Sequence, residues 1–165
     1  LATAEASSNL SRYDGVRYGH RTSEPGNPEA LYKKSRSEGF GKEVKRRILL
    51  GTFVLSADYH DAYYTQAQKV RRLIRDETRK LLQGYDILLM PTTPGTAFPL
   101  GSVSDPLSMY LGDIFSVQAN VAGVPAISFP YGKDRQGLPI GLQGLAQDFR
   151  EDRLLAFARI LSVDR

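Results

Sequence analysis

The chain has 165 residues, of which 41% are hydrophobic and 24% charged, and its formal net charge is +4. This length suits one domain with a real core, and the charge is too mild to require a polyanionic partner. The lack of cysteine excludes a disulfide framework, a thiolate nucleophile and a Cys-ligated zinc site.

The chain also lacks the marks of membrane insertion or secretion. No stretch approaches the roughly 20 continuous apolar residues of a membrane helix, so we expect no membrane contact. The N-terminal residues show no signal-peptide pattern and no initiating methionine. These features predict a cytoplasmic protein and a chain cut from a longer one.

The first half of the chain predicts helices around one loop. Residues 2–13 are mildly helical, and the Gly- and Pro-rich stretch after them predicts an exposed loop before a short helix at 31–36. Residues 42–50 contain no helix breaker, and residues 42–57 predict one helix. Asp58 is a candidate N-cap for a longer helix that reaches Gln83, with Gly84 placed to end it.

The second half changes to an alternation of strands and helices, which is typical of an α/β fold. The apolar run at 86–90 predicts a buried strand, followed by a loop rich in Pro, Gly, Ser and Thr. Residues 107–122 return to helical spacing and end before Gly123. Segments 126–130 and 138–146 predict two strands paired across a turn at 133–137, and 151–163 predicts an amphipathic helix.

Few residues offer catalytic chemistry. His20 lies in the loop with no partner in sequence, and His60 precedes Asp61 at a helix start, where we expect a surface role. The chain lacks the motifs of serine hydrolases, zinc proteases, dinucleotide sites and phosphate loops. We therefore expect no metal site.

Two charged residues could together recognise a small zwitterion. The run at 37–51 places glycines before a helix that is basic on one side, where a solvated face is the ordinary interpretation. Arg46 on that helix could grip a carboxylate with two parallel hydrogen bonds. Asp113 lies among apolar neighbours in a predicted helix, where its charge would need a cation, although capping or a surface ion pair is its ordinary role.

Five segments, in collinear order over nearly the whole chain, resemble one known family. They are EASSNLSRYDGVRYGHR, LYKKSRSEGFGKEVKRRILLGTFVLSADYHDAYYTQAQKVR, YDILLMPTTP, DIFSVQANVAGVPAISFPYG and GLPIGLQ. They are similar to the amidase signature family, and within it to the A subunits of bacterial glutamyl-tRNA(Gln) amidotransferases. The resemblance implies an α/β fold with a mixed β-sheet flanked by helices. It also implies that residues 1–165 are the C-terminal portion of a single amidase signature domain.

The resemblance further implies a parent subunit that hydrolyses glutamine with a Ser-cis-Ser-Lys triad. That triad lies in an N-terminal portion with no counterpart in these residues, so this chain would hold no catalytic residue and be inactive alone. The ammonia would serve the ATP-dependent conversion of Glu-tRNA(Gln) to Gln-tRNA(Gln) in a heterotrimer with subunits B and C. ATP and Mg²⁺ would bind the partner subunit, and this chain would need no cofactor.

The motif match also implies roles for individual residues. Arg46 in EVKRRI would hold the α-carboxylate of glutamine, and Asp113 in LGDIFS would hold its α-ammonium group. Arg47 is the alternative to Arg46.

Two other interpretations stay open. The C-terminal part of another amidase signature hydrolase, acting on a fatty or aryl amide, would present an apolar pocket with no zwitterion for Arg46 and Asp113. A non-enzymatic RNA-binding or scaffold module would use the basic face of the helix at 58–83, although the chain lacks interleaved exposed aromatic residues and any recognised RNA module.

Overall fold

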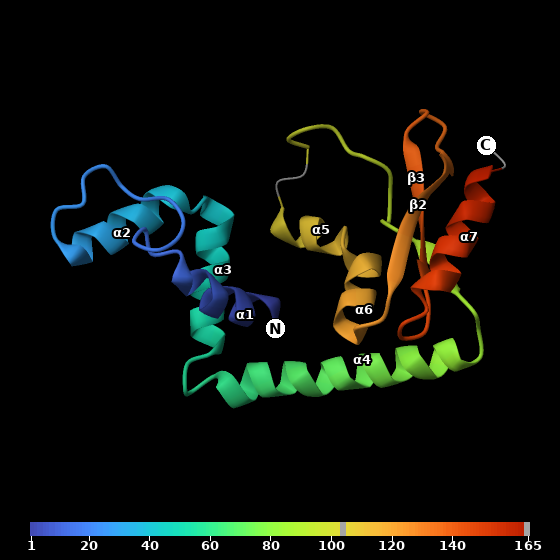
Figure 1. Ribbon diagram of the computed structural model, residues 1–165, viewed down its shortest axis with the longest axis horizontal. Coiled ribbons are helices and arrows are strands. Elements are labelled where there is room, and N and C mark those ends of the chain that lie inside the picture. The colour runs from blue at the N-terminus through green and yellow to red at the C-terminus, as the bar shows by residue number, and fades with distance from the viewer. Residues whose placement is uncertain (103–104, 164–165) are drawn as a thin grey trace. The chain divides into compact units, whose positions relative to one another are not determined.

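The computed structural model describes residues 1–102 and 105–163, which divide into two compact units, Leu1–Val70 and Arg71–Arg165. Helix α4 (Gln66–Gln83) runs from the first into the second (Figure 1). The first unit also holds α1 (Ala2–Asn9), a 3₁₀ turn (Leu10–Arg12), α2 (Pro28–Gly39), α3 (Lys42–Val54) and a π-helical turn (His60–Thr65). The second holds β1 (Leu88–Pro91), α5 (Pro106–Leu111), α6 (Ile114–Ala122), β2 (Ala126–Lys133), β3 (Pro139–Leu145) and α7 (Glu151–Val163).

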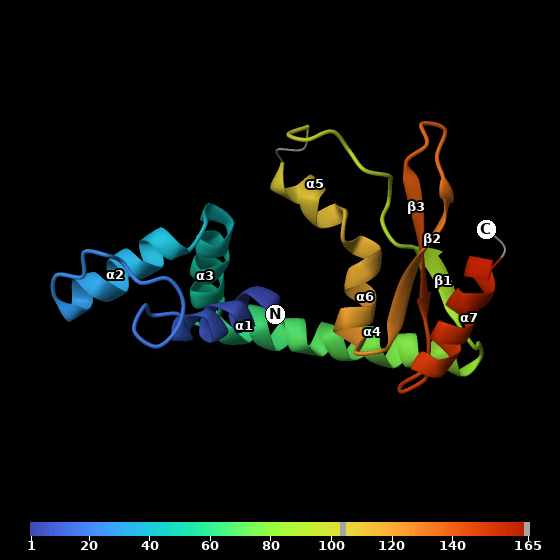
Figure 2. The same cartoon turned by 45° about the horizontal axis from the view of Figure 1, so that its top comes forward.

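In the first unit, α1 packs directly against α3 (Figures 1 and 2). Small residues make this approach possible. Ala4 and Gly51 are buried, and a Cβ atom on Gly51 would lie only 2.0 Å from the carbonyl oxygen of Thr3 and 2.7 Å from the side chain of Ser7. The helices are therefore closer than any larger side chain at Gly51 would allow.

The loop ahead of α2 is held by polar contacts to that helix. The Thr22 backbone N–H donates to Ser35 Oγ at 3.1 Å, and Thr22 Oγ1 donates to Glu38 Oε1 at 3.0 Å. His20 Nε2 lies 2.8 Å from Glu38 Oε2. His20 has no partner near it in sequence, and the fold supplies one in Glu38, which lies on α2 further along the chain.

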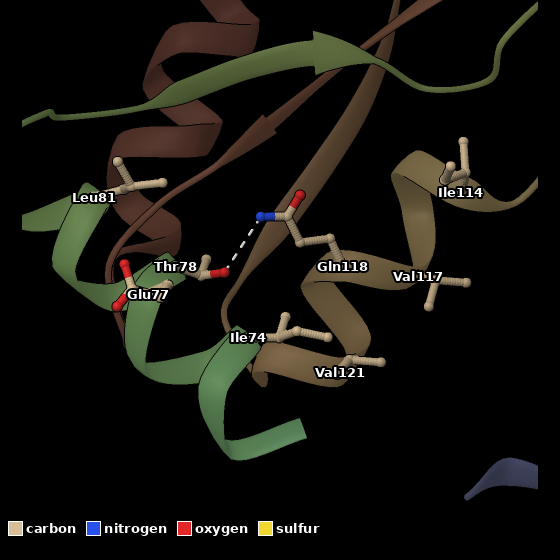
Figure 3. Close-up of a pocket in the computed structure, with 8 residues that line it drawn as sticks. All are labelled: Ile74, Glu77, Thr78, Leu81, Ile114, Val117, Gln118 and Val121. Atoms are coloured by element: carbon tan, nitrogen blue, oxygen red, sulfur yellow. Dashed lines mark hydrogen bonds between the residues drawn. The ribbon is translucent and has the colours of Figure 1, made fainter. Parts of the chain in front are cut away.

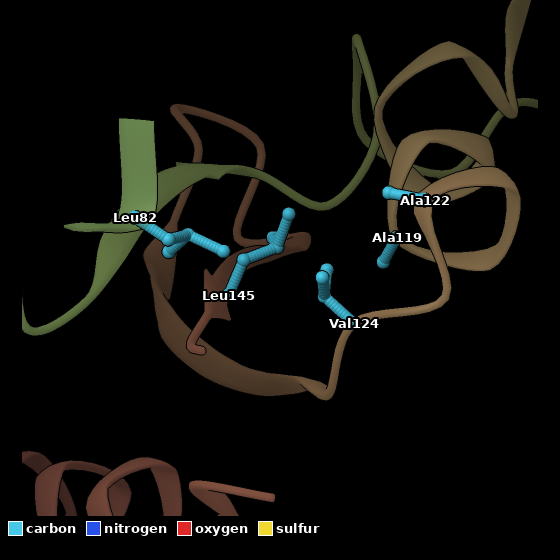
Figure 4. Close-up of a cluster of buried hydrophobic side chains, with 5 residues drawn as sticks. All are labelled: Leu82, Ala119, Ala122, Val124 and Leu145. Atoms are coloured by element: carbon cyan, nitrogen blue, oxygen red, sulfur yellow. The ribbon is translucent and has the colours of Figure 1, made fainter. Parts of the chain in front are cut away.

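The second unit is built on a three-stranded antiparallel sheet in the order β1-β3-β2. Figures 1 and 2 show α6 on one side of this sheet and α7 on the other. The end of α4, α6 and the central strand β3 supply the buried apolar cluster, which Figure 4 shows. Its members are Leu82, Ala119, Ala122, Val124 and Leu145.

The fold class is confirmed, since this is an α/β arrangement with helices flanking a sheet. Both strand pairings described here are antiparallel. One of them, between β2 and β3, is the predicted hairpin. Helix α7 has the predicted bounds, and α4 ends at Gln83 as expected. In the described part of the chain, no helix has the length and apolarity needed to cross a membrane.

Three elements of the structure differ from the predictions. Asp58 is not an N-cap: Tyr59 precedes the π-helical turn, and no side chain caps it. The predicted buried strand is half-exposed, because its residues alternate between a covered and an open face. The predicted helix over 107–122 is two helices, since the Gly112 and Asp113 N–H groups bond three residues back and thereby close the last turn of α5.

Candidate functional site

Arg46 lies on the exposed side of α3. Its Nη1 donates to Glu43 Oε2 at 3.0 Å, and Arg47 Nε donates to Glu43 Oε1 at 3.3 Å. Glu43 sits one turn earlier on the same helix, so both arginines meet the same carboxylate at the surface. A guanidinium has five N–H donors, and the bond to Glu43 uses one of those on Arg46. A ligand carboxylate could therefore bind Arg46 beside Glu43.

Asp113 lies at the joint between α5 and α6, in the N-cap position of α6. The expectation of a helix-interior position among apolar neighbours was wrong, because Asp113 is exposed at this break. Its side chain makes no capping hydrogen bond, while its carbonyl oxygen accepts from Val117 N at 2.9 Å and Ser116 Oγ at 3.1 Å. These two bonds tie the Asp113 carbonyl to the first turn of α6, and the Asp113 side chain is exposed there.

A polar pocket of about 480 Å³, called here the α6 pocket, lies between α6, β2 and β3. Four polar side chains line it: Ser116, Asn120, Ser128 and Gln143. Gln143 is 5% exposed, and its Nε2 donates to the carbonyl oxygen of Phe115 at 3.0 Å. Asn120 Nδ2 donates to the carbonyl oxygen of Ser116 at 2.9 Å. The pocket wall is therefore polar and internally hydrogen-bonded.

The α6 pocket was missed in the sequence. The segment that carries Gln143 reads as one arm of a hairpin, and a single glutamine in such a strand is equally consistent with a solvent-facing position. A hint lay in its spacing from Leu145, because residues two apart on a strand share a face. Both are buried.

The other side of α6 forms an apolar groove of about 410 Å³ with α4, which Figure 3 shows. Its apolar wall consists of Ile74, Leu81, Ile114, Val117 and Val121. Across the groove, Gln118 Nε2 of α6 donates to Thr78 Oγ1 of α4 at 3.2 Å. An apolar groove does not compensate the charges of a free amino acid, so the polar side of α6 suits such a ligand better.

The basic face of α4 is partly engaged within the second unit. Arg71 Nε donates to the carbonyl oxygen of Val121 at 3.3 Å, and Arg79 Nη2 pairs with an Asp148 carboxylate oxygen at 2.8 Å. Arg75 pairs with Asp76 at 3.2 Å. The ion pairs of Arg75 and Arg79 partly offset the positive charge that the helix offers to a nucleic acid, which weakens the RNA-binding alternative.

The residues predicted to bind substrate belong to separate units, Arg46 to the first and Asp113 to the second. Their placement on opposite sides of one glutamine stays a prediction. Among the described residues, no group of three or more His, Cys, Asp or Glu side chains could hold a metal ion.

Comparison with known proteins gives consistent matches over the whole chain. The profile of the family described as Amidase matches residues 1–155. The chain is 54% identical over 161 residues to the glutamyl-tRNA(Gln) amidotransferase A subunit of Halothermothrix orenii, covering 98% of this chain and 34% of the relative. It is 57% identical over 156 residues to the A subunit of Alkalilimnicola ehrlichii, covering 94% and 32%.

Solved structures agree. The crystal structure of the A subunit from Thermotoga maritima is 41% identical with a TM-score of 0.57, and the match covers 90% of this chain and 35% of that one. An amidase structure is 28% identical with a TM-score of 0.64, and the match covers 81% of this chain and 32% of that one. The chain thus spans about a third of the length of its relatives.

Proposed function

The chain belongs to the amidase family, and we propose that it is the C-terminal part of the glutamine-hydrolysing A subunit of a glutamyl-tRNA(Gln) amidotransferase. The observation that carries this proposal is the 54% identity to such an A subunit, which extends over 98% of the chain. Identity of this extent favours that subunit over the fatty-amide, aryl-amide and RNA-binding alternatives. Glutamine would be the substrate of the whole subunit, and its ammonia would convert Glu-tRNA(Gln) to Gln-tRNA(Gln).

The proposed complex is a cytoplasmic heterotrimer with subunits B and C. ATP and Mg²⁺ would act at the partner subunit, where the tRNA-bound glutamate is activated. The nucleophile that attacks the glutamine side chain would lie in the portion of the subunit that precedes this chain. This chain alone would release no ammonia from glutamine, and its contribution would be to bind substrate.

Arg46 and Asp113 would bind the two charged groups of glutamine. The Arg46 guanidinium, exposed on α3 with donors beyond the one given to Glu43, would hold the α-carboxylate. The Asp113 carboxylate, exposed and without a capping bond, would hold the α-ammonium group. A substrate that lacks either charge would leave one of these groups unpaired, which is how such a pair discriminates between amides.

The test compares two nitrogen donors in the assembled complex. Arg46→Ala in the whole subunit should raise KM for glutamine by at least about 30-fold, because a charged hydrogen bond contributes about 2 kcal/mol. The reaction supplied with ammonium salt should keep its rate, since ammonia bypasses the glutamine site.

Arg47→Ala is the matched control, because Arg47 binds the same carboxylate from the same helix. It should change KM for glutamine by less than about fivefold, as expected when a surface ion pair contributes at most about 1 kcal/mol. A larger effect of Arg47→Ala would transfer the role to Arg47. Equal loss of the glutamine and ammonia reactions by Arg46→Ala would refute the carboxylate site.

A further inference from the structure

Side-chain hydrogen bonds connect helix α6 to its surroundings at three positions along its length. Near its C-terminal end, Arg71 Nε donates to the carbonyl oxygen of Val121, and in its middle Gln118 Nε2 donates to Thr78 Oγ1. Both of these contacts come from α4. The connection at the first turn comes instead from the central strand, where Gln143 Nε2 donates to the carbonyl oxygen of Phe115.

We propose that Gln143 is a positioning residue: its carboxamide holds the first turn of α6, and with it Asp113, where the α-ammonium group of glutamine binds. This inference rests on the proposed function, because it assigns a partner to the ammonium-binding residue. Gln143 would act on the substrate through Asp113 rather than by contact.

The position of Gln143 makes it a rigid support. It lies on β3, which pairs with a strand on each side, and its Cα partners are Met90 on β1 and Ser128 on β2. A central strand moves less than an edge strand, because both of its hydrogen-bonding edges are engaged. Phe115 is the second residue of α6, two positions after Asp113. A movement of the Phe115 carbonyl therefore displaces Asp113 directly.

The burial of a polar carboxamide at Gln143 also needs an explanation. Gln143 shares the buried face of β3 with Leu145, which is fully inaccessible. A buried carboxamide costs free energy unless it is hydrogen-bonded, and an apolar side chain of similar size would pack here without that cost. The hydrogen bond to Phe115 compensates part of this cost, and it fixes an element that apolar packing alone would leave free to slide.

The other bonds at the joint that carries Asp113 are local. Val117 N and Ser116 Oγ bond to the Asp113 carbonyl oxygen, so Asp113 follows the first turn of α6 wherever that turn lies. Gly112 and Asp113 connect two short helices through bonds that reach three residues back, and Gly112 adds no side chain. Both Asp113 and Ile114 are exposed, so apolar burial does not hold the joint. Loss of the Gln143 contact should therefore widen the range of positions that the Asp113 carboxylate occupies.

Gln147 provides a matched control in the same chain. Its Nε2 donates to the carbonyl oxygen of Leu82 at 2.7 Å, so it too is a glutamine that supports a helix through a backbone carbonyl. That helix is α4, at its C-terminal end, and Gln147 does not line the α6 pocket. Replacement of either glutamine by methionine removes one such hydrogen bond and keeps an unbranched side chain of similar length.

The experiment uses the whole subunit in its assembled complex. Gln143→Met should raise KM for glutamine about tenfold, the effect of losing roughly one hydrogen bond's contribution to orientation. It should leave kcat at saturating glutamine and the ammonia-supplied reaction within about twofold of the parent. Gln147→Met should leave KM for glutamine unchanged. Hydrogen exchange of the α6 amides should rise in Gln143→Met and stay at the parent level in Gln147→Met.

A second variant, Gln143→Leu, covers the case in which Gln143→Met does not assemble. Its apolar side chain suits a buried position and cannot donate to the Phe115 carbonyl, so it should also raise KM for glutamine. An equal rise in KM for the Gln143 and Gln147 variants would overturn the positioning role, because it would reveal a general loss of packing.

The proposed function fails separately from this inference. An unchanged KM in the Gln143 variants together with a raised KM in Arg46→Ala would reject the inference and leave the function standing. An unchanged KM in both Arg46→Ala and Arg47→Ala would reject the glutamine site itself.

Discussion

The two units bury their interiors in different ways. In the first, the buried residues are small or polar: Ala4, Gly15, Thr22, Ser35 and Gly51. In the second, they include large apolar side chains such as Leu82, Phe129, Leu145 and Leu154. The first unit therefore depends on close backbone approach and on hydrogen bonds to side chains, whereas the second depends mainly on the apolar surface that it removes from water.

This difference changes what each unit tolerates. A close contact between two helices fails when a side chain becomes larger, because the backbone atoms opposite it cannot rotate away. An apolar cluster fails when a side chain becomes smaller, because a cavity remains. Substitutions of opposite kind should therefore be the most harmful in the two units.

The largest effect should follow from Leu145→Ala in the second unit. Leu145 is fully buried between the end of α4 and α6, so its truncation should lower the free energy of unfolding by about 4 kcal/mol. Denaturant titration measures this loss. Leu155→Ala on the exposed side of α7 is the control, with an expected change within about 0.5 kcal/mol. Similar losses for the two variants would contradict the assigned core.

The opposite change, Gly51→Ala, should be the harmful one in the first unit. The added Cβ would meet the Thr3 carbonyl oxygen at 2.0 Å, so α1 must move away from α3. We expect a loss of about 3 kcal/mol in the free energy of unfolding. A Cβ on Gly41 would meet nothing within 4 Å, and Gly41→Ala should cost about 1 kcal/mol or less. Equal effects at the two glycines would show that α1 and α3 are not closely packed.

Acidification should release the first unit's loop before it disturbs an ion pair in the second. The hydrogen bond to His20, and then that to Thr22, lowers the pKa of Glu38 below 4.5. A lowered carboxyl pKa contributes stability above the unfolded value, and that stability is lost as the pH falls through the folded value. In the second unit, Arg150 lowers the pKa of Asp152 to about 2.

Hydrogen exchange between pH 5 and pH 2 checks this order. The loop amide of Thr22, whose N–H bonds to Ser35, should lose protection as the pH falls through the lowered pKa of Glu38. The first turn of α7 should stay protected until about pH 2. Glu38→Gln should remove the pH dependence of the loop and leave that of α7 unchanged. Simultaneous loss in both places would contradict the assignment to Glu38.

The sequence predicted the elements whose signals are local. Helix α7 begins at Glu151 as expected from its amphipathic pattern, and α6 ends before Gly123, which takes the left-handed conformation with φ of 70°. The break at Gly112–Asp113 could not be predicted in this way. The apolar spacing runs through it without interruption, and only the tightened turn of α5 reveals it.

The site residues likewise differ in whether a local sequence signal could reveal them. Arg46 and Asp113 were candidates from their charge and local sequence, and the motif match gave them roles. Neither signal establishes exposure, and Asp113 proved to be exposed at a joint. Gln143 was missed because its partner, the Phe115 carbonyl, is a backbone group far away in the sequence. The pairing of His20 with Glu38 was missed for a similar reason.

Strand β3 receives its two neighbours from very different distances along the chain. The tight turn to β2 is organised by Asp134, whose carboxylate accepts from the Gln136 and Leu138 N–H groups at 2.8 and 2.9 Å. Such hairpins close in about 1–10 μs. Strand β1 pairs with β3 only after a long intervening loop has closed, which is slower and costs more entropy. We therefore expect the hairpin to be formed in the folding transition state, and β1 to add to its open edge afterwards.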